Sequence, residues 1–212
     1  MRIAVIGMGN VGSVLGRRWA EVGHQVTFCV RDPDKIEKRE AAGRAGASIG
    51  PVSEAMKADV VLLAVPWRAA ADALKAAGDL AGKVLLDCTN PVNSDFTDLT
   101  LPPDGSSGEA VARLVPQARV VKVFNTNGAK NMADPDYAGH KVSMFYAGDD
   151  GAANRLAAEL AAEIGFEPIE LGPLKYARLL EAMAMTWIIL ARHRGFGRDF
   201  ALDLVRRPSK AG

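Results

Sequence analysis

The first residues of the chain contain three glycines at the spacing of a dinucleotide-binding turn. An apolar run from Ile3 to Ile6 leads directly into the sequence GMGNVG, and a helix-like apolar pattern follows. In such a turn the first glycine permits the tight bend, the second lets the backbone approach a pyrophosphate, and the third lets the helix pack closely on the strand. A merely structural turn is the alternative, but the strand before it and the helix after it favour nucleotide binding. We therefore expect contacts to the nucleotide from Gly7, Met8, Gly9, Asn10, Val11 and Gly12.

The residues after the second predicted strand bear on the choice between NAD and NADP. An Asp or Glu at the end of that strand would bind the ribose 2′-hydroxyl, but this chain has Val30 followed by Arg31. Arg31 and Lys35 are two cations near the start of the next helix and suit a 2′-phosphate, so the sequence favours NADP, although both could also be solvated surface charges. Asp32 could take the acidic role, but its place before Pro33 fits a helix N-cap better.

Polar or conformationally restricted residues follow three further strand-like runs. Ligands of doubly wound sheets bind at the carboxyl ends of the strands, so these three turns should rim one crevice. Each turn alone could be ordinary turn chemistry, but three in register favour a functional site. The residues are Val65, Pro66, Trp67, Asn90, Pro91, Asn125, Thr126 and Asn127.

The sequence lacks the patterns of common acid–base and metal sites. It has no Ser-His-Asp order, no HExxH motif and no cluster of Cys and His, and its three histidines stand apart from one another. We therefore predict no catalytic side chain and no metal ligand. A nicotinamide site without an acid–base residue suggests direct hydride exchange with a second redox cofactor, in which the protein aligns the two reactants.

The predicted fold class is α/β, a Rossmann-type doubly wound and mostly parallel sheet with a small C-terminal extension dominated by one long apolar helix. Residues 1–140 would form the dinucleotide-binding domain, and residues 141–212 a strand–helix extension that covers the cofactor cleft within one compact unit. We expect strands at residues 2–7, 25–30, 47–49, 58–65, 83–89, 120–125, 141–147 and 166–171. We expect helices at residues 10–22, 32–45, from 53, 67–77, from a capping box at 106–109, 150–164 and 173–193.

The second half of the last predicted helix, MAMTWIILA, is apolar almost all round and must be buried by a partner. Packing within the monomer, the lining of a substrate cleft and a homodimer interface are compatible explanations. We therefore predict a homodimer.

The composition is that of an ordinary globular protein. The chain has 212 residues, 49% hydrophobic and 24% charged, and a formal net charge of +1, which gives no reason to expect a nucleic acid or membrane partner. Cys29 and Cys88 each lie in an apolar run. We interpret them as two buried thiols of a protein in a reducing compartment, not as a disulfide framework. With no leader before the first strand and no run long enough to span a bilayer, we predict a cytoplasmic protein.

The chain resembles the NADP-dependent reductases of the 8-hydroxy-5-deazaflavin coenzyme F420 and the broader group of dinucleotide-binding oxidoreductases around them. The N-terminal domain of the vertebrate membrane ferric reductases is a more distant relative. The resemblance covers nearly the whole chain and rests on GMGNVG at 7–12, VR at 30–31, VPW at 65–67, TNP at 89–91, FNTNGAKNM at 124–132, AGDD at 147–150 and LGPLKYARLLEAMAMTWI at 171–188.

The resemblance implies NADP with its pyrophosphate on Gly9 to Val11, its 2′-phosphate near Arg31 and Lys35, and its nicotinamide near Pro66, Trp67 and the Asn90-Pro91 turn. The second cofactor, coenzyme F420, would stack on the nicotinamide under the C-terminal helix. Hydride would pass between nicotinamide C4 and deazaflavin C5 without a covalent enzyme intermediate. The residues near the deazaflavin would be Asn125, Thr126, Asn127 and the turn Gly172-Pro173-Leu174.

The chain departs from the F420 reductases at two places. Those reductases have a serine at the position of Val30, and a histidine-threonine pair followed by proline where this chain has Asn125, Thr126 and then Gly128. NADP binding therefore carries over better than the deazaflavin. The alternatives are reduction of a free flavin, a ferric chelate or a small carbonyl or imine substrate, and a non-catalytic NADPH sensor, which would have a closed cleft beside the nicotinamide.

Overall fold

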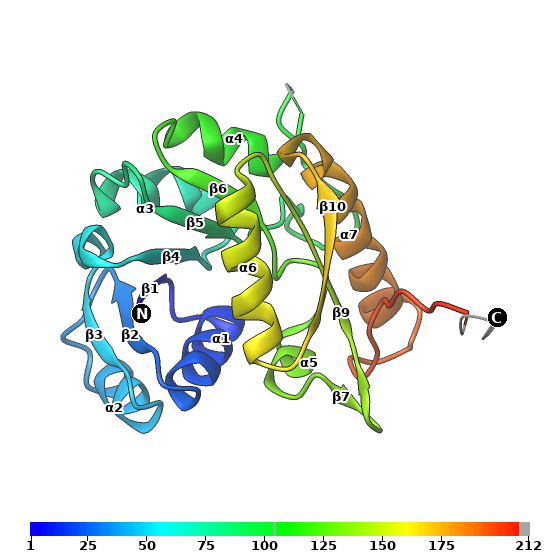
Figure 1. Cartoon of the computed structure of the whole chain (residues 1–212), viewed down its shortest axis with the longest axis horizontal. Coiled ribbons are helices and arrows are strands. Elements are labelled where there is room, and N and C mark those ends of the chain that lie inside the picture. Colours follow the sequence, from blue (N-terminus) through cyan, green and yellow to red (C-terminus); the bar gives the residue numbers. More distant parts are fainter. Residues whose placement is uncertain (104, 208–212) are drawn as a thin grey trace.

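An eight-stranded sheet forms the centre of the molecule, in the order β10-β9-β6-β5-β4-β1-β2-β3 (Figure 1). The computed structural model describes residues 1–103 and 105–207. Neighbouring strands are parallel except β6 and β9, which pair antiparallel, so the predicted fold class is confirmed. The strands are β1 (Arg2–Ile6), β2 (Gln25–Val30), β3 (Ser48–Pro51), β4 (Val60–Leu63), β5 (Val84–Asp87), β6 (Arg119–Lys122), β9 (Ser143–Gly148) and β10 (Glu167–Gly172).

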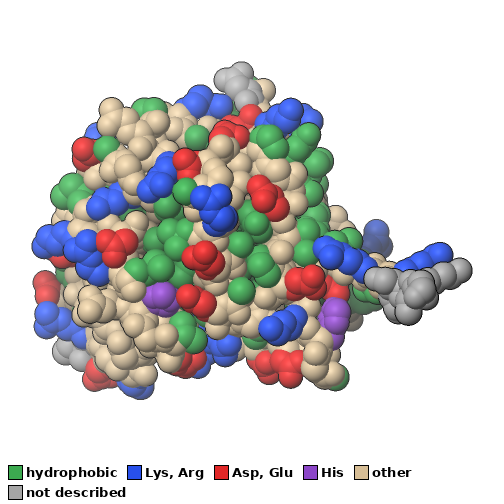
Figure 2. All heavy atoms as spheres, in the orientation of Figure 1, with side chains coloured by type: hydrophobic (Ala, Val, Ile, Leu, Met, Phe, Trp, Pro, Cys, Tyr) green, Lys and Arg blue, Asp and Glu red, His purple; other side chains and the backbone are tan. Residues whose placement is uncertain are grey.

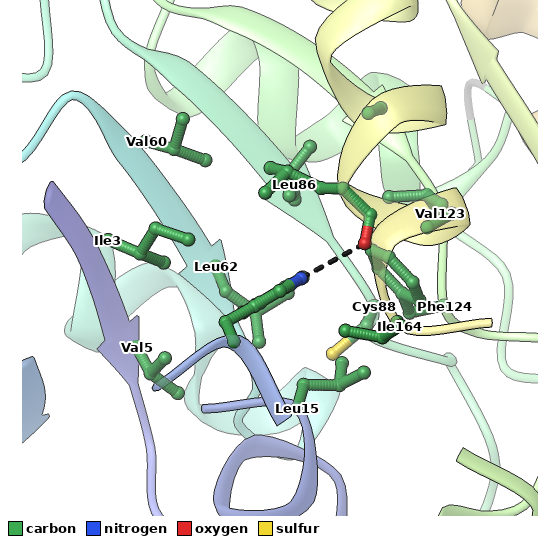
Figure 3. Packing of buried hydrophobic residues seen from close by; sticks show 14 of the residues in the cluster. Ile3, Val5, Leu15, Val60, Leu62, Leu86, Cys88, Val123, Phe124 and Ile164 are labelled. Carbon is green, nitrogen blue, oxygen red and sulfur yellow. Dashed lines mark hydrogen bonds between the residues drawn. The ribbon is translucent and has the colours of Figure 1, made fainter. Parts of the chain in front are cut away.

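Helices cover both faces of this sheet (Figure 1). On one face α1 and α6 bury a cluster around Trp19, whose indole N–H donates to the Leu160 carbonyl oxygen at 3.1 Å. Figure 3 shows Leu62 and Leu86 of the central strands in this cluster. On the other face Leu74 of α3 packs in a second cluster with residues of α4 and α7. The helices are α1 (Asn10–Glu21), α2 (Ile36–Arg44), α3 (Ala70–Ala77), α4 (Ser107–Leu114), α5 (Ala129–Ala133), α6 (Gly151–Glu163) and α7 (Ala177–His193).

The central strands end earlier than the sequence predicted. β6 ends at Lys122 instead of residue 125, because Phe124 adopts a left-handed backbone conformation, with φ 60°, that a strand cannot contain. β4 ends at Leu63 and β5 at Asp87, each two residues before the predicted end. The residues after these three strands therefore belong to turns, which frees their polar groups from the sheet.

The start of α2 corrects a prediction about Asp32. The helix begins at Ile36 with Lys35 at the N-cap position, instead of beginning after an N-cap at Asp32, and none of its described neighbours caps it with a side chain. Residues 33 and 34 form a turn, and the Asp32 carboxylate lies 3.8 Å from the Lys35 ammonium. The sequence signal was ambiguous because an Asp-Pro pair is as favourable in a turn as at a helix start.

Other elements differ in detail from the prediction. The short helix expected from residue 53 is a 3₁₀ helix at Val52–Lys57, and two predicted helices open with 3₁₀ turns at Trp67–Ala69 and Leu174–Tyr176. The capping box is confirmed, with the Ser106 hydroxyl accepting from the Glu109 N–H. No sequence pattern predicted α5 or the β7–β8 hairpin (Asp136–Tyr137 and His140–Lys141), which are too short to show a hydrophobic period.

The apolar second half of α7 is only partly covered within the monomer. Ala184 and Met185 are buried, whereas residues 187–190 are half-buried. One side of this segment lines a cavity, which agrees with one of the three explanations for its apolar surface, the lining of a cleft. The homodimer and the cytoplasmic location stay predictions. No helix in the described part of the chain is long and apolar enough to cross a bilayer.

Candidate active site

A groove of about 290 Å³ lies at the carboxyl ends of β1, β2 and β4, and we call it the nucleotide groove. Both halves of the predicted nucleotide site meet here, the glycine turn from the first strand and Arg31 from the second. The groove also contains residues that sequence analysis missed, among them Lys38 of α2 and Asp72 of α3. The predicted residues that line it are Gly7, Met8, Gly9, Val30, Arg31, Val65 and Pro66.

The three glycines of the turn have different roles. Gly7 has φ 103°, and a Cβ there would lie 2.5 Å from the Ala64 carbonyl oxygen. A Cβ at Gly12 would overlap the Gly7 carbonyl oxygen, so these two glycines are required by the packing of the turn itself. A Cβ at Gly9 would meet no described atom within 4 Å. Gly9 therefore borders open space, as expected where a phosphate group approaches the backbone.

The N-terminus of α1 faces this open space with its backbone groups free. Gly9 is the N-cap residue; among the described residues no side chain caps the helix, and its first turn contains no acidic residue. The first N–H groups of a helix have no partner within the helix, so those of Asn10, Val11 and Gly12 are available to a ligand. An uncapped helix N-terminus whose first turn contains no carboxylate is a favourable site for a phosphate anion.

The cations near the predicted 2′-phosphate site are Arg31 and Lys38. Both line the nucleotide groove, whereas Lys35 does not and instead lies within ion-pair distance of Asp32. Asp32 does not line the groove either. Because α2 begins at Ile36, the lysine that reaches the groove is the one in the first turn of the helix, three residues after Lys35.

A larger cavity of about 610 Å³ lies on the other side of the α1 N-terminus, and we call it the strand-end cavity. The turns after β5 and β6 line one side of it, and α7 with Trp187 and Ile188 lines another. The predicted residues that line it are Asn10, Val11, Asn90, Asn125, Thr126 and Asn127. Trp67, Pro91 and Leu174 line neither cavity; Trp67 packs against the second core cluster and Leu174 is buried inside it.

Three consecutive residues of the strand-end cavity bury polar atoms without a partner. Asn125, Thr126 and Asn127 are 5%, 1% and 6% exposed. The Oδ1 of Asn125, the Oγ1 of Thr126 and the Oδ1 of Asn127 make no hydrogen bond to any described group. A buried polar atom left unpaired costs about 1–3 kcal/mol, so three in a row beside a cavity indicate a place where a ligand completes the hydrogen bonds.

The turn after β5 is held against the turn after β6. The Asn90 amide donates to the Asn125 carbonyl oxygen at 2.9 Å, and the Asn125 amide donates to Asn90 Oδ1 at 3.0 Å. This reciprocal pair fixes the two strand-end turns relative to each other. It joins residues that the sequence predicted to rim one crevice.

A second group of polar residues lies buried at the same edge of the sheet, and we call it the closed cluster: Lys122, Asp87, Glu181 and Ser107. The Lys122 ammonium lies 2.9 Å from Asp87 Oδ2 and 3.2 Å from Glu181 Oε1, and all three side chains are fully buried. It also donates to Ser107 Oγ at 2.9 Å and to the Thr89 carbonyl oxygen at 2.5 Å. The cluster ties α7 to the sheet.

Sequence analysis missed the closed cluster. Its signals were two charged residues inside predicted apolar strands, Lys122 and Asp87, and these did not reveal the distant glutamate that joins them. The cluster lines neither of the two cavities.

The strand-end cavity offers little for acid–base or nucleophilic chemistry. None of its described lining residues is a carboxylate, a histidine or a cysteine. Cys88 lies near this edge of the sheet, but burial and the neighbouring Asp87 charge raise the pKa of its thiol to about 12, so it stays protonated. What the described lining offers is orientation of a bound ligand, through the amide and hydroxyl groups of Asn125, Thr126 and Asn127.

Comparison with known proteins identifies the family. The model of the family "NADP oxidoreductase coenzyme F420-dependent" matches residues 2–91. The crystal structure of a protein from Arthrobacter sp. FB24, assigned as an F420-dependent NADP reductase, is 32% identical and superposes with a TM-score of 0.87 over 96% of this chain and 99% of that one. This chain belongs to the F420-dependent NADP oxidoreductase family. It is a member of a family of NADP-dependent oxidoreductases, as the sequence motifs predicted.

Two curated relatives are more distant. The F420-dependent NADP reductase of Methanocaldococcus jannaschii is 26% identical over 200 residues, which cover 86% of this chain and 89% of that protein. Metalloreductase STEAP3 of Rattus norvegicus is 28% identical over 186 residues, which cover 87% of this chain. The match spans only 36% of the metalloreductase's length.

Proposed function

We propose that this oxidoreductase binds NADPH across the nucleotide groove and the strand-end cavity and exchanges a hydride between its nicotinamide and coenzyme F420. The observation that carries the proposal is the row of unpartnered polar atoms at Asn125, Thr126 and Asn127, buried beside a cavity of about 610 Å³ whose described lining contains no carboxylate, histidine or cysteine. The names of the family and of two relatives supply the identity of the second cofactor.

The nucleotide groove fits the phosphates of NADPH. The pyrophosphate would bind the N–H groups at the start of α1, where Gly9 leaves the backbone open. The 2′-phosphate would bind Arg31 and Lys38, the two cations that line the groove. This assignment keeps Arg31 from the sequence prediction and replaces Lys35 by Lys38.

The strand-end cavity fits the reacting end. When bound, NADPH supplies the hydride carried by its nicotinamide. Asn125, Thr126 and Asn127 hydrogen bond polar ring substituents and so fix the orientation of the planar groups. Trp187 and Ile188 of α7 form the apolar wall that limits water. Holding two reactants in a reactive orientation is itself worth several orders of magnitude in rate, and the chain needs no covalent participation for it.

Two other functions make different predictions. Similarity to a metalloreductase favours a ferric chelate as the second candidate partner, and a free flavin is the other acceptor that the sequence left open. A non-catalytic NADPH sensor would have a closed cleft beside the nicotinamide, and the size of the strand-end cavity favours an enzyme instead.

One assay separates these functions. The purified protein is mixed with NADPH and oxidised coenzyme F420, and the absorbance of the nicotinamide and of the deazaflavin is followed. We expect both to fall together at equal molar rates. Absence of turnover with the deazaflavin, together with turnover of FMN or a ferric chelate, would overturn the F420 assignment in favour of the second candidate. NADPH binding without turnover of any of these acceptors would favour the sensor.

A further inference from the structure

The mouth of the strand-end cavity is positively charged. Three of its described lining residues are cations, Lys130 of α5, Arg192 at the end of α7 and Arg198 of the C-terminal segment, and none is an anion. The Lys130 ammonium pairs with Asp199 at 2.5 Å. Among residues 1–103 and 105–207, no carboxylate lies within 4 Å of the Arg192 or Arg198 guanidinium. These two arginines therefore carry charge that the described part of the protein leaves uncompensated.

The structure holds Arg192 in place without neutralising it. Its guanidinium stacks on the Phe96 ring, with 3.9 Å between guanidinium carbon and ring centroid. The neighbouring His193 Nε2 donates to the Phe96 carbonyl oxygen at 3.0 Å. Stacking leaves the edge of a guanidinium, with its N–H donors, free for an anion.

Arg198 is held at the cavity by the segment that follows α7. This segment folds back on the body of the protein through Phe200, which stacks on Trp187 at 5.4 Å between ring centroids and accepts a hydrogen bond from the Trp187 indole N–H at 2.9 Å. Further along, Asp203 accepts from the Ser143 N–H at 2.9 Å. Figure 1 shows this segment running beside α7, and Figure 2 shows Lys and Arg side chains where it projects from the body.

We propose that Arg192 and Arg198 bind an anionic side chain of the redox partner, a phosphate or a carboxylate, and so select planar redox molecules that carry such a group. The proposal rests on the proposed function, because it assumes that the partner occupies the strand-end cavity. NADPH has its own phosphate donors at the α1 N-terminus, Arg31 and Lys38. A charged hydrogen bond of this kind changes affinity by roughly tenfold when it is partly exposed to solvent.

The test compares pairs of acceptors that differ only in charge. Coenzyme F420 is compared with 8-hydroxy-5-deazariboflavin, which has the same ring system without the anionic side chain, and FMN is compared with riboflavin. Binding is measured by fluorescence titration and turnover by KM and kcat, for the wild type, the double variant Arg192→Gln/Arg198→Gln and the matched control Arg194→Gln. Arg194 is an exposed arginine of the same segment that does not line the cavity.

We expect the wild type and the control to prefer the anionic member of each pair by roughly tenfold or more. The double variant should lose this preference through a higher KM for the anionic member, while kcat, the neutral member and the KM for NADPH stay unchanged. A preference retained by the double variant, an equal rise in the KM for NADPH, or no binding of any acceptor would each overturn the proposal.

The same experiment separates the proposal from the function on which it rests. If neither deazaflavin is reduced, the F420 assignment fails. A preference for FMN over riboflavin that disappears in the double variant would still support the arginines as the anion site.

Discussion

Two groups of buried polar residues lie at the carboxyl edge of the same sheet, and they differ in one respect. In the closed cluster, Lys122 contacts both Asp87 and Glu181 and has further partners in Ser107 and the Thr89 carbonyl oxygen. In the strand-end cavity, three equally buried residues keep atoms that nothing described satisfies. Burial of polar groups alone therefore does not mark a binding site here. The proposed binding site rests on the unmet hydrogen bonds that lie beside an open cavity.

The N-termini of α4 and α1 show the same difference between satisfied and unsatisfied polar groups. The first N–H groups of α4 are all occupied: Ser106 and Glu109 form a capping box, and the Glu181 carboxylate accepts from the Ser107 and Gly108 N–H groups, each at 3.2 Å. The first N–H groups of α1 have no cap from any described side chain. A carboxylate of the protein occupies the N-terminus of α4, and the free N–H groups of α1 are where we propose that a phosphate binds.

The largest expected effect comes from breaking the closed cluster. Lys122→Met removes the only cation of the cluster and leaves the two buried carboxylates, Asp87 and Glu181, without their shared counter-charge. We expect the free energy of unfolding to fall by about 3–5 kcal/mol, measured by urea denaturation. The matched control is Lys57→Met, which removes an exposed ion pair to Glu54 and should cost less than about 1 kcal/mol. A loss for Lys122→Met as small as that of the control would show that the cluster does not hold the edge together.

The second effect separates packing from ligand binding within the glycine turn. Gly12→Ala places a Cβ against the Gly7 carbonyl oxygen, so it should lower both the thermal midpoint and the affinity for NADPH. Gly9→Ala places its Cβ in open space, so it should leave the thermal midpoint of the free protein unchanged and weaken NADPH by roughly a hundredfold, since the methyl group occupies the approach of the pyrophosphate. Calorimetry and isothermal titration measure the two quantities. An unchanged NADPH affinity in Gly9→Ala would place the phosphates elsewhere.

The sequence predicted the features that short segments determine. The glycine turn and the Ser106 capping box each depend on a few adjacent residues, and each is found where it was expected. Of the three strand-end turns expected to rim one crevice, those after β5 and β6 share the strand-end cavity, whereas Val65 and Pro66 line the nucleotide groove instead. Lys35 does not line the groove because α2 begins three residues later than predicted, so Lys35 precedes the helix instead of lying in its first turn.

The features that sequence analysis missed depend on distant contacts. Glu181 joins Lys122 only because α7 packs on α4 and β9. Arg198 reaches the strand-end cavity only because Phe200 stacks on Trp187. No local sequence pattern predicts either contact, because each forms only when distant segments of the chain pack together.

A smaller effect tests which cations complete the nucleotide site. Arg31→Ala should weaken NADPH binding by roughly tenfold and change NADH binding less than about twofold, because only NADPH carries the 2′-phosphate. Lys38→Ala should act in the same direction, whereas Lys35→Ala should change neither dinucleotide, since Lys35 does not line the groove. Equal losses of NADPH and NADH in Arg31→Ala would refute the role in 2′-phosphate binding. A selective loss in Lys35→Ala would restore the original sequence prediction.

The smallest expected change in stability is the sharpest test of the comparison between the strand-end cavity and the closed cluster. Loss of one hydroxyl should change the free energy of unfolding differently in the two regions. Thr126→Val keeps the shape of the side chain and removes a hydroxyl that has no described partner, so the free energy of unfolding should stay constant or rise by about 1 kcal/mol. Ser107→Ala removes a hydroxyl that donates to Glu181 at 2.6 Å and accepts from Lys122, and the same measurement should fall by about 1–3 kcal/mol.

Activity should change in the opposite order. Thr126→Val should slow hydride exchange, because the hydroxyl that it removes is free for the ligand, and Ser107→Ala should leave kcat close to that of the wild type. A Thr126→Val variant that is destabilised and fully active would mean that the hydroxyl serves the fold. The unmet hydrogen bonds of Asn125, Thr126 and Asn127 would then no longer indicate a binding site. The strand-end cavity and the closed cluster would differ only in that the first is open.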